Sequence, residues 1–527
     1  MRSYDAIVVG AGHNGLTAAA LLQRAGLSTL CLESKRYAGG MASTVELFDG
    51  YRFEIAGSLQ FPTSAEVNRE LGLDSLPGVE RDVMSVSMQG IGDAPVVYYT
   101  DPMRMMEHLN EVHGMDSVLG MGGLMAWSQA PTRALGRFDA GKPPKTLDQM
   151  YACATDAFER STITDLLFAS ATDILDRYLP DRQRHGALRG MLALLATNVT
   201  YRGPATPGSA AALAFGLAVP DESTVLMRKL KGGIGTLTAH LQQLFTSAGG
   251  TLALRSEVQE IRVASGRIAG VLTADGSAFD APIVLSCVSP DLTLTQLVTP
   301  AAVSTDVRER FSGVDHRGSY VQMHFALDGA PEFVAPYELL NDPAMQGAIG
   351  LFSTPEELQQ QWEDCRRGIV PAEPSIAFQI PSAQDPELAP PGKHAASAFS
   401  LWFPVEADHA DYARLKADMG RNVINRITRL APNFERLISK YATFTPRHMA
   451  TMFGAPGGDY CHGLVHPEQM GPNRPGPRGH LDQPLGIDGL YLGSAGCHGG
   501  PGITFIPGYN AARAALADHG RQAGTLT

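Results

Sequence analysis

The chain has 527 residues, of which 44% are hydrophobic and 18% are charged, and its formal net charge is −12. This length is too great for one simple core, so two structural domains are expected. The acidic balance argues against a nucleic-acid partner, because phosphate binding requires a basic face.

The first thirty or so residues read as a complete β-α-β unit. Residues 4–9 are a short apolar run of the kind that forms a buried parallel strand. The sequence GAGHNG follows at residues 10–15, residues 16–24 read as a helix, and residues 27–32 read as a second strand that ends at Glu33. This is the length expected of a dinucleotide-binding unit.

Apolar spacing predicts the elements of the remaining chain. Residues 63–224 look mainly helical, and residues 320–403 alternate strands with long loops. Residues 231–235 open a further helix that runs to about residue 248, and helices are also expected over 413–430 and 509–517. Further strands are expected over 251–254, 257–263, 267–273, 283–286 and 489–493. Residues 454–484 form a Gly/Pro-rich loop.

Each glycine of the first motif has its own physical role. Gly10 permits the tight turn out of the strand, Gly12 lets the backbone approach a pyrophosphate at the positive end of the helix, and Gly15 lets helix and strand pack closely. Glu33 stands eighteen positions after Gly15, where its carboxylate can accept hydrogen bonds from ribose hydroxyls. A 2′-phosphate there would meet like charge, so NADP is disfavoured.

Three segments resemble those of the amine oxidase and phytoene desaturase superfamily of flavoproteins. They are GGMAST at residues 39–44, the block over 231–290, and GLYLGSAGCHGGPGITFIPGYNAA from residue 489. The GHNGL of residues 12–16 also resembles desaturase-fold β-carotene ketolases and pyridine nucleotide-disulphide oxidoreductase domain-containing protein 2. The resemblance implies one bound FAD.

Besides Gly10, Gly12, Gly15 and Glu33, the motifs and the resemblance assign cofactor contacts to His13, Asn14, Ser34, Lys35, Gly39, Gly40, Met41, Ala42, Ser58, Val258, Gly493, Ser494, Gly502 and Ile503. Met41 departs from the family pattern, because amine oxidases and many desaturases have Arg there. A phosphate or flavin contact made by that Arg must be absent or come from another group.

The resemblance implies an α/β fold in which a Rossmann-like FAD-binding domain is interleaved with an α+β substrate-binding domain. We expect residues 1–65, 225–310 and 478–527 to form the FAD domain, because the three FAD-like segments must meet at one cofactor. Residues 66–224 and 311–477 are then the substrate-binding domain.

The chemistry expected is direct exchange of hydride between an organic substrate and flavin. The sequence has neither a second G-x-G-x-x-G nor a C-x₄-C pair near the first helix, so a separate NAD(P)H domain and a thiol relay are disfavoured. We expect a desaturase, dehydrogenase or oxidase acting on a largely apolar molecule, isoprenoid or carotenoid in type, with reoxidation by oxygen or a quinone. A ketolase or isomerase using the same flavin, or a non-catalytic escort-type binding protein, stays an alternative.

Two histidines are the candidate catalytic groups. His498 stands before the helix that faces the flavin in the superfamily, and His462 matches a His-Gly of the ketolase-like relatives. The alternative for His498 is a bond to a backbone carbonyl, and for His462 a position in solvent. We expect both to face one mostly hydrophobic substrate cavity.

The cysteines and the chain ends bear on compartment and partners. The six cysteines stand singly, which supports neither a zinc site nor a redox disulfide and suits a reducing compartment. No signal peptide is visible, and the uncharged stretches contain Pro and Gly, unlike membrane spans. We expect a cytoplasmic protein with a small apolar substrate and no metal; a peripheral membrane contact and the oligomeric state stay open.

Overall fold

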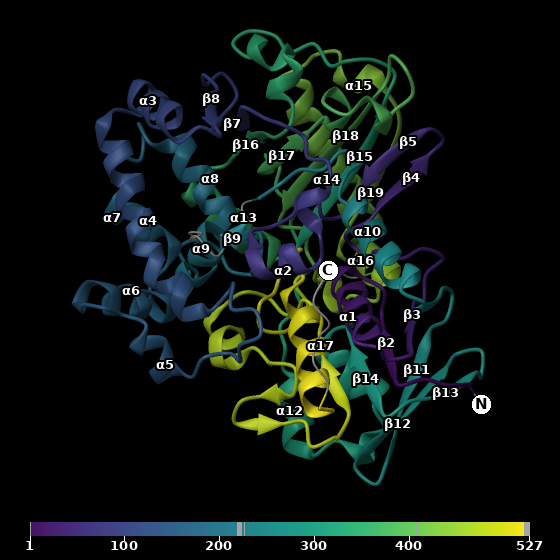
Figure 1. Ribbon diagram of the computed structural model, residues 1–527. Helices are drawn as coiled ribbons and strands as arrows, with labels where there is room; N and C mark the ends of the chain where they lie inside the picture. Colours follow the sequence, from purple (N-terminus) through teal and green to yellow (C-terminus); the bar gives the residue numbers. More distant parts are fainter. Residues whose placement is uncertain (1, 219–223, 226, 407–408, 521–527) are drawn as a thin grey trace.

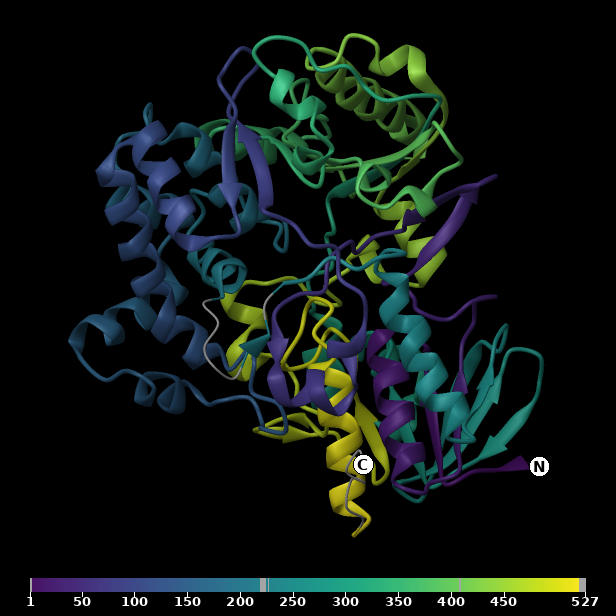
Figure 2. The ribbon, with the colours of Figure 1, turned by 45° about the horizontal axis from the view of Figure 1, so that its top comes forward.

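The computed structural model describes residues 2–218, 224–225, 227–406 and 409–520. Figure 1 shows a parallel-sheet part that carries both ends of the described chain, a second part with a larger sheet, and a helical part in blue. Figure 2 shows the helical part on one side of the molecule, next to both of the others. None of the described helices is both long and apolar enough to cross a membrane.

The centre of the first part is a parallel sheet with the strand order β10-β3-β2-β14-β22 in the described chain. Its strands are β10 (Thr251–Ala253), β3 (Thr29–Leu32), β2 (Ala6–Val9), β14 (Ile283–Ser286) and β22 (Leu490–Leu492). In β2, β3, β14 and β22 every residue is buried, as expected of apolar runs in a parallel sheet covered on both faces.

Alternate residues of these strands pack into two different clusters. Ala6 and Val8 of β2 pack toward the helices α1 (His13–Arg24), α10 (Gly235–Ser247) and α17 (Ile506–Asp518). Ile7 and Val9 pack on the other face, against a second sheet with the order β1-β13-β12-β11 and against α12 (Thr305–Ser312). The strands of that sheet are β1 (Arg2–Ser3), β13 (Ala278–Asp280), β12 (Arg267–Thr273) and β11 (Val258–Ala264).

The largest sheet of the described chain has the order β19-β15-β18-β17-β16-β7-β8. Its strands are β19 (Ile438–Phe444), β15 (Tyr320–Leu327), β18 (His394–Leu401), β17 (Ile376–Gln379), β16 (Ile349–Leu351), β7 (Val83–Met88) and β8 (Val96–Tyr99). The helices α14 (His409–Thr428) and α15 (Phe434–Leu437) cover one face. Strands β7 and β8 interrupt the stretch 63–224, whose described residues are otherwise mainly helical, as expected.

The helical part packs against this sheet and against the loop that carries His462. Its helices are α3 (Pro102–His113), α4 (Met115–Leu135), α5 (Leu147–Ala152), α6 (Ala157–Phe168), α7 (Ala171–Tyr178), α8 (Gly186–Thr197) and α9 (Ala210–Leu217), with α13 (Pro355–Cys365) beside α8. One apolar cluster joins these helices to Tyr320, Trp402 and Cys461. The side chains of Tyr320 and Trp402 therefore belong to the hydrophobic core.

Shorter elements connect the parts. They include β4 (Thr44–Phe48), β5 (Tyr51–Glu54), β6 (Thr63–Ser64), α2 (Ala65–Glu70), β9 (Thr224–Val225), α16 (Pro446–Phe453), β20 (Gly479–His480) and β21 (Gln483–Pro484).

The mixed α/β fold with a Rossmann-like part is the one expected. The parallel sheet takes its strands from the three stretches assigned to the FAD domain, and the largest sheet takes its strands from the other two. We keep the five domain ranges as a proposal. They also include residues 1, 219–223, 226, 407–408 and 521–527, which lie outside the described residues.

Candidate functional site

The glycine motif forms the turn from β2 into α1. Gly10 has φ +91°, which glycine adopts without strain, and a Cβ at Gly15 would lie 1.8 Å from the Gly10 carbonyl oxygen. A Cβ at Gly12 would meet nothing within 4 Å among the described residues, and no side chain there caps α1. The positive end of the helix therefore faces open space, as a phosphate site requires.

Glu33 joins the glycine motif to the end of β3. One carboxylate oxygen accepts from the Ala11 amide at 2.9 Å, and the other accepts from the Lys35 amide at 2.9 Å and from the Ser34 hydroxyl at 3.3 Å. The side chain is buried, yet a carboxylate has about four lone-pair sites, so acceptor capacity remains for ribose hydroxyls. The Arg255 amide donates to the Lys35 carbonyl, which brings the segment leading to Val258 beside this acid.

The second glycine pair lies against the first motif. Gly39 bridges to Gly12, and the Gly39 amide donates to the Ala11 carbonyl at 2.7 Å. A Cβ at Gly40 would lie 3.3 Å from the Gly12 Cα atom. Gly39 and Gly40 thus lie beside the same end of α1 as Gly12.

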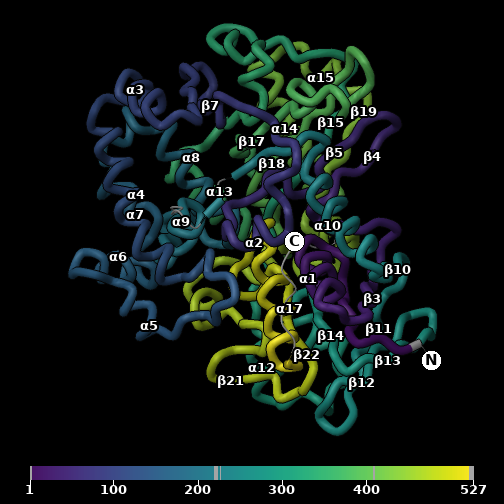
Figure 3. The backbone as a smooth tube through the Cα atoms, in the orientation of Figure 1, coloured from purple at the N-terminus to yellow at the C-terminus, as the bar shows by residue number. Residues whose placement is uncertain are grey.

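The C-terminal segment meets α1 as well. The Gly508 amide donates to Asn14 Oδ1 at 3.3 Å, and the His13 and Phe505 rings meet edge to face at 5.7 Å. A Cβ at Gly57 would lie 2.7 Å from the Ile503 side chain, next to the partly buried Ser58. Figure 3 shows α17, in yellow, beside α1, in purple.

Two buried polar atoms at this helix end have no hydrogen-bond partner among the described residues. They are His13 Nε2 and Asn14 Nδ2. Burial, followed by the neighbouring His462, lowers the pKa of His13 to about 4, so the ring is neutral. Unpartnered polar atoms beside an open helix end fit the polar groups of a dinucleotide.

The other residues assigned to the cofactor are buried or closely packed against neighbouring residues. Ala42 is buried, and Met41 packs against the large apolar cluster, so no cation stands at the family's Arg position. Gly493 ends β22 so closely against α17 that its Cβ would lie 2.9 Å from the Ala511 Cβ atom. Ser494 accepts from the Gly496 amide at 3.1 Å, and Gly502 lies against Phe61.

His462 is held in an unusual backbone conformation. Its φ is +53°, and Nδ1 has no hydrogen-bond partner among the described residues. The carboxylate of Asp459 accepts hydrogen bonds from the amides on both sides of His462, those of Cys461 at 2.7 Å and Gly463 at 2.6 Å. The surrounding protein lowers the pKa of His462 to about 4, chiefly by burial, so the ring is uncharged at neutral pH.

A third histidine, His316, forms an ion pair with Asp459. His316 lies between Asp459, at 3.0 Å from Nδ1, and Asp291, at 3.1 Å from Nε2. Burial opposes its charged form, but the bonds to the two aspartates prevail and raise the pKa of His316 to about 9. The imidazolium is therefore charged at neutral pH and stabilises the carboxylate that holds the His462 loop.

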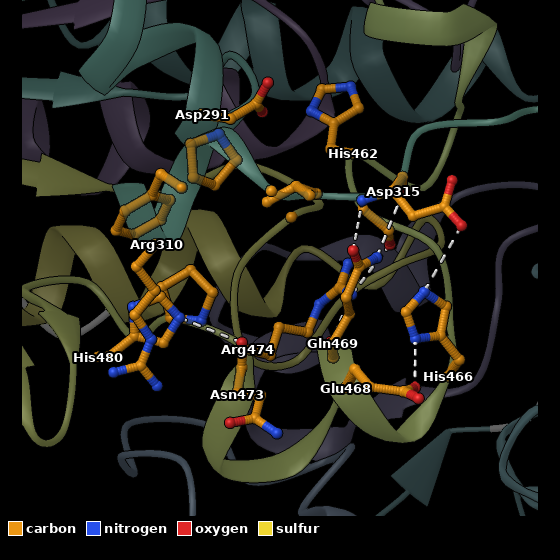
Figure 4. Close-up of a pocket in the computed structure, with 17 residues that line it drawn as sticks. Asp291, Arg310, Asp315, His462, His466, Glu468, Gln469, Asn473, Arg474 and His480 are labelled. Atoms are coloured by element: carbon orange, nitrogen blue, oxygen red, sulfur yellow. Dashed lines mark hydrogen bonds and ion pairs between the residues drawn. The ribbon is translucent and has the colours of Figure 1, made fainter. Parts of the chain in front are cut away.

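His462 and Asp291 line a polar cavity of about 210 Å³ (Figure 4). Its other polar walls come from Arg310, Asp315, His466, Glu468, Gln469, Asn473, Arg474 and His480. His498 instead lines a smaller cavity of about 20 Å³, with Leu135, Phe215, Val465 and Met470.

The expectation that both histidines face one cavity is therefore not met by the cavities described, because His462 and His498 line different ones. The wall between the two cavities contains Arg474, a residue that lines both. His498 is buried, with Nε2 unpartnered and its pKa lowered to about 4, chiefly by burial.

Comparison with known proteins agrees with this geometry. The model of the NAD(P)-binding Rossmann-like domain matches residues 8–71. Pyridine nucleotide-disulfide oxidoreductase domain-containing protein 2 of Mus musculus is 28% identical, over 98% of this chain and 94% of its own. A component of the limonene dehydrogenase of Castellaniella defragrans is 25% identical over 99% and 96%, and the lycopene-forming phytoene desaturase of a Paracoccus species is 25% identical over 95% of each chain.

A solved structure of putrescine oxidase has the same fold. It aligns with a TM-score of 0.61 over 98% of this chain and 99% of its own, at 16% identity. The chain is an oxidoreductase that is similar in sequence to a phytoene desaturase and in fold to an amine oxidase.

In this oxidoreductase, the residues that organise the histidine loops were missed by sequence reasoning. Asp291, His316, Asp459 and Arg474 stand far apart along the chain and match no spacing motif. Only Asp459, three positions before His462, carried a local signal, because Asp side chains readily accept from nearby backbone amides.

Proposed function

We propose that this oxidoreductase binds FAD and passes hydride to it from a largely apolar organic substrate. The convergence of residues 10–15, 39–40 and 502–508 on the open end of α1 carries this proposal. When bound, FAD supplies a two-electron acceptor for a hydride leaving a substrate C–H bond.

The chain's own residues would hold the cofactor along the α1 end of the sheet. Glu33 would accept from the adenosine ribose, the α1 amides would face the pyrophosphate, and Val258 would lie at the adenine. Met41 would leave to other donors the contact that Arg makes in relatives. The unpartnered Asn14 Nδ2 can supply one such donor.

His462 and His498 are the proposed acid–base groups. Loss of a hydride from one carbon of a desaturation substrate leaves a proton to be removed from its neighbour. The lowered pKa values keep both rings neutral, so each has a nitrogen lone pair that can receive that proton. His462, beside the polar cavity, can pass the proton onward to water.

The apolar substrate class rests on the relatives. Two relatives are named for limonene and for phytoene.

The test is anaerobic reduction of the purified, FAD-loaded protein with a panel of terpene, carotenoid, steroid and amine substrates. We expect bleaching of the flavin absorbance by an apolar substrate without NADH or NADPH, and recovery on adding oxygen or a quinone. A protein that cannot be loaded with FAD would contradict the proposal and favour an escort-type binding role. Isomerised product without net consumption of an acceptor would indicate the isomerase alternative, and stoichiometric NADPH use would refute direct exchange.

A further inference from the structure

Arg474 places all of its donors on backbone carbonyls. Nη1 donates to Gly463 O at 3.0 Å and to Gln469 O at 3.4 Å, and Nη2 donates to Cys461 O at 3.0 Å and to Ala495 O at 2.6 Å. Nε donates to Cys497 O at 3.3 Å. A guanidinium has five N–H groups, so this buried side chain is fully used.

The carbonyls chosen flank the two candidate histidines. Cys461 and Gly463 stand on either side of His462, and Cys497 stands immediately before His498. The next residue along the chain from Arg474, Pro475, accepts from the His498 amide at 2.8 Å. One side chain and its neighbour therefore hold both loops.

The two loops also touch directly. A Cβ at Gly496 would lie 2.4 Å from the His462 carbonyl oxygen, so a larger residue would push the loops apart. His462 has φ +53°, a conformation that costs a non-glycine residue free energy and persists only when its surroundings impose it. Asp459 binds the two amides around His462, and Arg474 binds the two carbonyls, so the peptide groups on both sides are tied.

Arg474 also forms part of the wall between the cavities, since it lines both. We propose that Arg474 is a positioning residue that sets the rings of His462 and His498 on opposite sides of this wall, acting through the carbonyls beside each ring. This inference rests on the proposed function for the assignment of the two histidines as acid–base groups. The Arg474 charge has a second effect, secondary to burial, of lowering the pKa of both rings.

The test is a histidine NMR titration of the FAD-loaded protein labelled with ¹³C at the histidine Cε1 atoms. The His462 and His498 signals are assigned with His462→Ala and His498→Ala. Arg474→Ala removes the donors and the charge, whereas Arg474→Lys keeps the charge but has at most three donors. Arg478→Ala is the matched control, because Arg478 makes a half-exposed ion pair with Asp518.

We expect both histidine signals to shift in both Arg474 variants and their pKa values to rise in Arg474→Ala alone. Flavin reduction should slow at least tenfold in both, guanidinium ions should restore part of the rate in Arg474→Ala, and Arg478→Ala should behave as wild type. If Arg474→Ala does not fold, Arg474→Lys decides. Unshifted signals in a folded Arg474 variant, or equal shifts in Arg478→Ala, would overturn the inference. If instead His462→Ala and His498→Ala reduce flavin at the wild-type rate, the proposed acid–base role fails while the signals still report the positioning.

Discussion

Replacing Glu33 by Gln should weaken FAD binding without unfolding the protein. Glu33→Gln keeps the side-chain shape and one acceptor oxygen but removes the charge and turns the other oxygen into a donor. That donor would face the Ala11 or the Lys35 amide, both of which the carboxylate now accepts from at 2.9 Å. The variant therefore has one acceptor oxygen fewer for the backbone amides of Ala11 and Lys35 and for the ribose hydroxyls of FAD.

The magnitude follows from the lost charge-assisted bond. Hydrogen bonds to a charged group contribute about 1.5–3 kcal/mol, which corresponds to a rise in the Kd for FAD of about 10- to 150-fold. The assay is titration of the FAD-free protein with FAD, followed by quenching of flavin fluorescence, together with thermal unfolding of the FAD-free variant. Glu257→Gln is the control, because it removes an equal but exposed charge next to Val258.

A Kd within about twofold of wild type for Glu33→Gln would refute the placement of the ribose at this acid. Equal weakening in Glu257→Gln would mean that net charge, and not the Glu33 contact, governs affinity.

Three further outcomes follow from the same geometry. Gly12→Ala should fold as wild type but retain less FAD, because its Cβ enters open space at the helix end. Gly15→Ala should instead destabilise the fold, because its Cβ would lie 1.8 Å from the Gly10 carbonyl oxygen. Measurements of flavin content and of thermal unfolding distinguish the two effects. His316 has a folded pKa raised to about 9, so its contribution to stability is complete below pH 6.5 and is lost as pH rises through 9. At about 1.4 kcal/mol per pKa unit, the advantage of wild type over His316→Gln in urea unfolding should shrink by about 3 kcal/mol between pH 6 and pH 9.5. The rate of flavin reduction should stay level down to pH 5 and fall only near pH 4, where His462 gains its proton, and a fall near pH 6.5 would contradict the lowered pKa.

The part of the fold that sequence reasoning predicted is the part set by local pattern. The strand, glycine turn, helix and acid of residues 4–33 are adjacent in the chain, and β2, α1 and β3 form there with limits shifted by at most three residues. Strands β7 and β8 were not predicted, because they occur within a helical stretch and β7 gains its parallel neighbour β16 from more than 250 residues further on.

The candidate site was predictable only in its cofactor half. Glu33 and the glycines obey a spacing that backbone geometry demands. Arg474 bonds to carbonyls, which every residue type possesses, so its partners leave no mark in the sequence. Asp291 and His316 likewise stand 25 positions apart and meet only in the folded chain, where His316 also contacts Asp459.

The position of β22 has a consequence for biosynthesis. This edge strand of the parallel sheet, and the helix α17 that packs on α1, come from the last forty described residues, whereas β2 and α1 come from the first twenty-five. During translation the nascent sheet has an unpaired β14 edge and an uncovered α1 face until residues 490–518 have left the ribosome. Such long-range closure makes folding slow and exposes aggregation-prone surface, so we expect expression yield to depend on chaperones and synthesis temperature.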